Sequence, residues 1–203
     1  MPLTQLVRTH DYAYAWRKLR SAPQYRRARL RTLLRLVTWG LHCLFHRPAV
    51  VTLRPWGCRI YLPAGRKVGS TAVYLFREDY EPELRHLEQL LSPGDVFIDA
   101  GASVGVYTVV ASKLVGEEGT VLAFEPAEVT FPILLRNAKL NGINNIRSFQ
   151  AALSDRVGTA RLFHVGGASL YSLGTTSDGN DASEEVRTTT LDEAVREQRL
   201  RTV

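Results

Sequence analysis

Cysteine is scarce in this sequence, in which Cys43 and Cys58 are the only two thiols among 203 residues. A small secreted scaffold held together by disulfides needs several cysteine pairs, so that class of protein is excluded. The cysteines and histidines also lack the close spacing of a zinc site. The sequence therefore predicts reduced thiols and no bound metal.

Long apolar runs are missing as well. Residues 1–8 contain no apolar core of the kind a signal peptide requires. The most apolar early stretch, residues 33–45, is interrupted by Arg35 and His42 and is too short to span a bilayer. We therefore expect a cytoplasmic protein.

Acidic residues are almost absent from the first 47 positions, where ten Lys and Arg side chains accompany Asp11 alone. That segment carries +9, whereas the remainder, with 16 basic and 19 acidic residues, carries −3. Apolar residues recur near the helical period between the arginines, which predicts a basic helical extension over residues 1–48. Two interpretations stay open: a solvated helix packed on the domain, or contact of residues 8–47 with a membrane surface or a nucleic acid.

The sequence pattern over residues 49–203 predicts a partial α/β domain. Turn residues at 55–57 between two apolar runs indicate a hairpin over 49–63, and a loop with Gly65 and Gly69 follows. A short amphipathic helix is expected at 81–91. Strands at 96–99, 119–125 and 145–150 then alternate with helices at 104–115 and 130–140, which predicts a parallel, right-handed, doubly wound sheet. Two shorter strands, at 159–164 and 186–190, flank a Gly- and Ser-rich loop, and a helix begins at 191.

The segment from Asp99 to Gly105 carries the clearest chemical signal, because it ends a strand and opens a helix. Gly101 and Gly105 permit a sharp turn and leave room for a ligand, and the helix start offers unpaired N–H groups. Glu125 ends the next strand, where a carboxylate can accept hydrogen bonds from both hydroxyls of a ribose. A tight strand-to-helix turn without a ligand is the plainer explanation of the glycines.

Two nucleotide ligands suit that geometry. A dinucleotide normally requires G-x-G-x-x-G, where the backbone approaches a pyrophosphate, and this sequence has G-x-x-x-G instead. S-adenosylmethionine has no pyrophosphate and needs room for its methionine part and a carboxylate for its ribose. The sequence thus favours S-adenosylmethionine.

The same residues resemble the FkbM-type class I methyltransferases, a family with a Rossmann-like sheet. The resemblance extends over residues 50–195 and rests on the order and spacing of several pieces. These pieces are residues 80–83 (YEPE), 95–108 (DVFIDAGASVGVYT), 124–126 (FEP), 141–142 (NG), 151–155 (AALSD) and 189–192 (TTLD). One departure is Ser103, where the family usually has Asn; its hydroxyl can still serve the loop, so we expect cofactor binding to persist.

The resemblance implies a cofactor-binding role for eleven positions. Asp99, Gly101 and Gly105, with the adjoining loop, would line the methionine side, which Tyr80 and Glu81 would close. Glu125 would bind the ribose, and the chain near Gln150 would border the adenine. The full set is Tyr80, Glu81, Asp99, Gly101, Ala102, Ser103, Gly105, Glu125, Pro126, Gln150 and Ala151. A strand-end residue at 150 and a helix-starting acid at 81 are equally open interpretations.

The resemblance also implies a fourth core strand beside the first, and no apolar strand follows residue 190. We therefore expect a truncated sheet that shows only its N-terminal half, with residues 96–99 as an unpaired edge open to self-association. The implied function is S-adenosylmethionine-dependent methylation, O-directed on a small molecule or glycan, with no catalytic base identified. Two alternatives stay open: an inactive fragment that binds a cofactor or partner, and a nucleic-acid methyltransferase that uses the basic arm.

Overall fold

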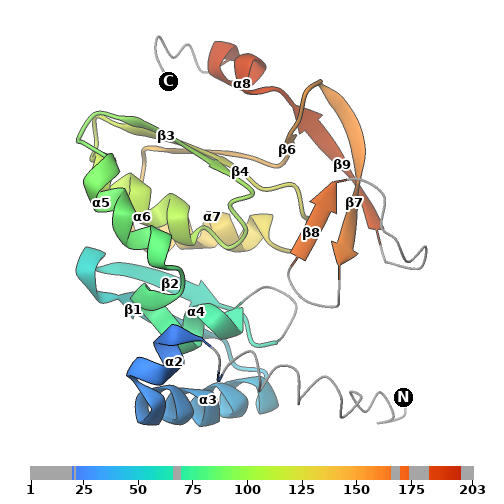
Figure 1. Ribbon diagram of the computed structural model, residues 1–203. Coiled ribbons are helices and arrows are strands. Elements are labelled where there is room, and N and C mark those ends of the chain that lie inside the picture. The colour runs from blue at the N-terminus through green and yellow to red at the C-terminus, as the bar shows by residue number, and fades with distance from the viewer. Residues whose placement is uncertain (1–19, 21, 66–69, 166–169, 174–182, 198–203) are drawn as a thin grey trace.

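In the computed structural model, an α/β core stands between a helical N-terminal layer and a second, mixed sheet (Figure 1). The structure describes residues 20, 22–65, 70–165, 170–173 and 183–197. Within these ranges, no helix combines the length and the apolar character needed to cross a bilayer. A cytoplasmic location stays a prediction.

The N-terminal helical layer consists of α2 (Pro23–Arg27) and α3 (Arg29–Leu44). The two helices are separate because Ala28 leaves the helical region, with φ −143° and ψ 52°. The part of the expected helix before residue 20 lies outside the described residues. The indole of Trp39 on α3 joins the same apolar cluster as the hairpin and the main sheet. The division at residue 48 stays a prediction.

The expected hairpin is confirmed as β1 (Ala49–Leu53) and β2 (Cys58–Leu62), joined by a 3₁₀ turn at Arg54–Trp56. Gly57 supplies the positive φ of 64° that closes the turn. The hairpin alternates buried and exposed side chains, and its buried face adds to the central core.

Between the hairpin and the main sheet, the predicted structure was partly wrong. The expected loop after residue 63 contains a helix, α4 (Ser70–Phe76), which buries Val73, Tyr74 and Leu75. The helix expected at 81–91 is mostly 3₁₀, at Pro82–His86, with one α-turn, α5 (Leu87–Leu90). Another 3₁₀ turn, Arg77–Asp79, precedes it.

The alternating β-α-β-α-β series is confirmed. Strands β3 (Val96–Ala100), β4 (Thr120–Phe124) and β5 (Ile146–Phe149) form a parallel sheet in the order β3-β4-β5. Helices α6 (Val106–Val115) and α7 (Phe131–Leu140) cover one face, and α8 (Leu191–Glu197) packs against the other through Ala194 and Val195. Among the described strands β3 is an edge, as predicted. Self-association at that edge stays a prediction.

The second sheet has the order β6-β9-β7-β8, with β6 at Ala152–Leu153, β7 at Gly158–Val165, β8 at Leu170–Leu173 and β9 at Ser183–Thr189. The two strands predicted in this part of the chain correspond to β7 and β9, while β6 and β8 were not predicted. Most of the predicted Gly- and Ser-rich loop lies outside the described residues.

Candidate functional site

The strand-to-helix loop after β3 is the centre of the candidate site. Gly101 and Ala102 donate their backbone N–H groups to the carbonyl of Phe124, over 2.8 and 2.9 Å, which fixes the loop to the end of β4. Gly101, Ser103 and Gly105 all have positive φ values, of 84°, 51° and 85°. Because Gly105 is left-handed, α6 begins at Val106 and not at residue 104 as predicted.

The two glycines of this loop are required for different reasons. A Cβ on Gly105 would lie 2.5 Å from Cδ1 of Leu134, a fully buried side chain on α7. A Cβ on Gly101 would meet no atom within 4 Å, because Gly101 faces a cavity. Gly105 thus allows helix packing, whereas Gly101 leaves space for a ligand.

The buried carboxylate of Glu125 fixes the loop through hydrogen bonds. Its side chain is only 3% exposed. Oε2 accepts the backbone N–H of Ser103 over 2.7 Å, and Oε1 accepts both the N–H of Ala127, over 2.9 Å, and the hydroxyl of Thr130, over 2.7 Å. A carboxylate offers about four lone-pair positions, so the chain itself uses three and leaves about one for a ligand hydroxyl.

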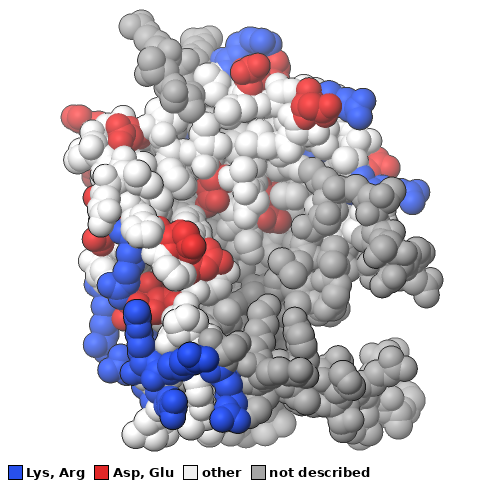
Figure 2. All heavy atoms as spheres, in the orientation of Figure 1, with Lys and Arg blue, Asp and Glu red and all other residues white. Residues whose placement is uncertain are grey.

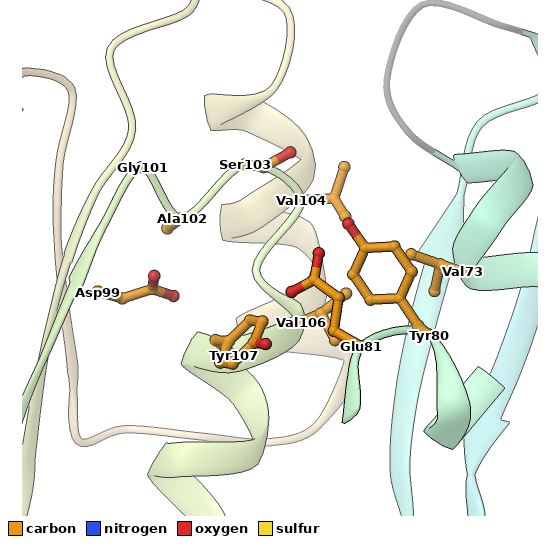
Figure 3. Close-up of a pocket in the computed structure, with 10 residues that line it drawn as sticks. All are labelled: Val73, Tyr80, Glu81, Asp99, Gly101, Ala102, Ser103, Val104, Val106 and Tyr107. Carbon is orange, nitrogen blue, oxygen red and sulfur yellow. The ribbon is translucent and has the colours of Figure 1, made fainter. Parts of the chain in front are cut away.

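A cavity of about 130 Å³ opens beside the loop. Six of the predicted residues line it: Tyr80, Glu81, Asp99, Gly101, Ala102 and Ser103. Val73, Val104, Val106 and Tyr107 complete the lining. Figure 3 shows the carboxylates of Glu81 and Asp99 pointing into the space between the loop and the ring of Tyr107. The cavity is smaller than the sites that enclose a whole drug-sized ligand, so it suits one end of a larger molecule.

The remaining predicted residues do not line this cavity. Gly105 follows the lining residues of the loop, and Glu125 contacts the loop through the backbone N–H of Ser103. Pro126, Gln150 and Ala151 follow the ends of β4 and β5, where the N–H of Glu125 donates to the carbonyl of Phe149 over 3.0 Å. Gln150 is exposed and Ala151 is buried. They therefore follow the same edge of the sheet as the β3–α6 loop but lie outside the lining of the cavity.

Sequence reasoning missed four lining residues: Val73, Val104, Val106 and Tyr107. Val73 was missed because helix α4 was not predicted. Tyr107 stands two residues after Gly105, on the first turn of α6, so its position was predictable once the helix start was known. No His lines the cavity among the described residues, and His46 and His86 are exposed elsewhere. In the described part of the chain no cluster could hold a metal ion.

The cavity is strongly acidic. Burial raises the pKa of the Asp99 carboxyl, the charges of Glu125 and Glu81 raise it further, and hydrogen bonds from Thr108 lower it. Burial likewise raises the pKa of the Tyr80 and Tyr107 phenols, and the neighbouring Glu81 raises both further. Because the ten lining residues include no Lys, Arg or His, the cavity favours a cationic ligand.

Replacing Asp99 with asparagine is expected to raise stability at neutral pH and to weaken binding of a cation. The raised pKa means that folding favours the protonated carboxyl, so Asp99 costs stability once the pH exceeds its ordinary pKa. The amide oxygen can still accept the hydroxyl of Thr108. Urea unfolding should show Asp99→Asn more stable at pH 7, with a gap that narrows as the pH falls. A variant less stable at pH 7 would contradict this interpretation.

The chain belongs to the methyltransferase FkbM domain family, whose model matches residues 99–203. It is 38% identical over 117 residues to 31-O-demethyl-FK506 methyltransferase FkbM of Streptomyces tacrolimicus, covering 55% of this chain and 44% of that protein. It is 31% identical over 93 residues to methyltransferase sdnD of Sordaria araneosa, covering 45% and 35%. The matched region thus spans less than half the length of these relatives.

Solved structures give weaker matches. A SAM-dependent O-methyltransferase from Thermotoga maritima is 18% identical, with 56% of this chain and 46% of that chain covered and a TM-score of 0.35. A Plasmodium falciparum protein solved with S-adenosyl-L-homocysteine is 19% identical, with 51% and 44% covered and a TM-score of 0.30. The family assignment rests on the domain match, and the Rossmann-like arrangement on the parallel sheet itself.

Proposed function

We propose that this chain binds S-adenosylmethionine and takes part in methyl transfer to oxygen on a small molecule or glycan. The observation that carries the proposal is the acidic cavity at the β3–α6 loop. S-adenosylmethionine carries two positive charges at its methionine end, on the sulfonium and on the ammonium group. Glu81 and Asp99 are buried or half-buried carboxylates that would face those charges without competition from a basic side chain in the lining.

Two groups of residues would bind the two ends of the cofactor. Glu81, Asp99 and the loop at 101–103 would hold the methionine end in the 130 Å³ cavity. Glu125 would accept a ribose hydroxyl through its remaining lone pair, and Pro126, Gln150 and Ala151 would border the adenine at the ends of β4 and β5. The bound cofactor would supply an activated methyl group, while the chain's own contribution is positioning.

The oxygen acceptor is proposed by analogy. The Streptomyces relative is named for methylation of an O-demethyl compound, and that supports an oxygen acceptor on a small molecule. A chain that binds the cofactor without turnover is the second candidate, because the polar residues that line the cavity are proposed to hold the cofactor and none of them is assigned to the acceptor. A single-turnover assay with candidate acceptors separates the two.

A ligand panel in thermal unfolding tests the cofactor proposal. S-adenosylmethionine and S-adenosylhomocysteine should both raise the melting temperature, since ligands that bind the folded state stabilise it. Methylthioadenosine, which lacks the amino-acid part, should act only at higher concentration. NAD should have no effect. Equal stabilisation by NAD, or by methylthioadenosine at the same concentration, would contradict a site built around the methionine end.

A further inference from the structure

Helix α3 has two apolar faces, of which one is already used. The inner face carries Trp39, whose indole N–H donates to the hydroxyl of Thr71 over 2.9 Å and whose ring lies 4.8 Å from that of Tyr74. Arg35 donates to the carbonyl of Leu75 over 2.7 Å. These contacts attach α3 to α4 and fix which side of α3 points away from the domain.

The outer face of α3 is an apolar stripe with no covering element among the described residues. Its members are Leu30, Leu34, Val37, Leu41 and Leu44, which are 50–72% exposed and are followed by Phe45 at 65%. The alternating spacing of four and three residues places them on one line along the helix, opposite the buried Thr32 and Trp39. At 1.5 Å per residue the stripe is about 21 Å long.

The same region is purely basic. Residues 20–54 contain eight arginines and no Asp or Glu. Apart from the half-buried Arg35, these side chains are exposed, and Figure 2 shows Lys and Arg gathered at the end of the molecule where α2 and α3 lie. The aliphatic stripe is thus surrounded by arginine side chains, with no acidic side chain between residues 20 and 54.

We propose that the outer face of α3 binds the surface of an anionic phospholipid bilayer. An interfacial helix inserts an apolar face among the acyl chains while nearby arginines bind the anionic headgroups, so this partner suits both the stripe and the charge. A second copy of α3 would bring arginines of two helices together without an acid between them. A nucleic acid would bind the arginines but leave the aliphatic stripe exposed to water.

Vesicle co-sedimentation of the full chain tests this proposal. The chain should bind vesicles of phosphatidylcholine mixed with phosphatidylglycerol much more strongly than vesicles of phosphatidylcholine alone, and less strongly as salt is raised. Leu34→Gln/Leu41→Gln should lower the partition coefficient about tenfold or more, because two leucines no longer insert. Arg27→Gln/Arg31→Gln should reduce the preference for anionic vesicles.

Matched controls come from exposed residues elsewhere. Leu90 on α5 and Val157 in the loop before β7 are as exposed as the stripe leucines but lie away from α3, so Leu90→Gln/Val157→Gln should leave vesicle binding unchanged. Circular dichroism would verify that each variant is folded. Three results would overturn the proposal: equal partitioning to neutral and anionic vesicles, stripe variants that alter only the oligomeric state, or binding to RNA with none to vesicles.

Discussion

Replacing Glu125 with glutamine is expected to lower the free energy of unfolding by about 3 kcal/mol. The two carboxylate oxygens accept three hydrogen bonds, from the N–H groups of Ser103 and Ala127 and from the hydroxyl of Thr130. In either orientation, the amide of glutamine presents its own N–H groups to at least one of these donors. For each donor that loses its partner in this way, the lost charge-assisted hydrogen bond costs about 1.5–3 kcal/mol of stability.

Urea unfolding measures this loss, and Glu128→Gln is the matched control because Glu128 is an exposed acid three residues further on. A Glu125→Gln variant as stable as the control would contradict the role of Glu125 in holding the loop. The result also affects binding experiments. Loss of cofactor binding in a Glu125 variant identifies a ligand contact only when the variant is measured under conditions in which it is folded.

Replacing Gly105 with alanine is expected to lower the free energy of unfolding by about 2–5 kcal/mol. Its φ of 85° is unfavourable by about 1–2 kcal/mol for a residue with a Cβ. The new Cβ would also lie 2.5 Å from Cδ1 of the buried Leu134, and such overpacking costs about 1–3 kcal/mol. Either α7 moves away from the loop or the loop loses its shape, and both affect the cavity. Thermal or urea unfolding gives the size of the loss.

Gly101→Ala is the matched control, because Gly101 has nearly the same φ, 84°, and open space around its Cβ position. It should cost only the backbone strain. In a Leu134→Ala background, the cost of Gly105→Ala should fall toward that of Gly101→Ala, since the collision is gone. An unchanged cost in that background would show that backbone strain, and not helix packing, requires glycine at 105.

Much of the core was predictable because its residues follow simple periods. The three parallel strands are short apolar runs. Each of the two intervening helices ends next to a glycine, Gly116 after α6 and Gly142 shortly after α7. Six cavity residues were also predicted: the strand-to-helix turn indicated Asp99 and Gly101, and the resemblance to the family implied the other four, Tyr80, Glu81, Ala102 and Ser103. Ser103 has a φ of 51°, a region that Asn tolerates well, which agrees with the Asn that the resemblance led us to expect at this position.

What sequence reasoning could not predict depends on tertiary contacts. Asn137 accepts the N–H of Tyr61 over 2.6 Å and donates to the carbonyls of Tyr61 and Val104, so α7 binds the hairpin much as a neighbouring strand would. Asn141 pairs in the same way with the backbone of Arg59. Nothing local in the sequence distinguishes these amides from solvent-exposed helical residues. Helix α4 was missed for a similar reason, because it is buried by tertiary packing against α3 and within the central apolar cluster.

Calorimetric titration of S-adenosylmethionine into the folded chain is the most direct test of the proposed cofactor site. The wild-type chain should bind one equivalent. Glu81→Gln should weaken binding about tenfold or more, because the variant loses a lining carboxylate that attracts the cationic groups of the ligand. Glu88→Gln, at an exposed acid on α5, should bind like the wild type. Absence of binding by a folded wild-type chain, or equal affinities for Glu81→Gln and wild type, would contradict the account.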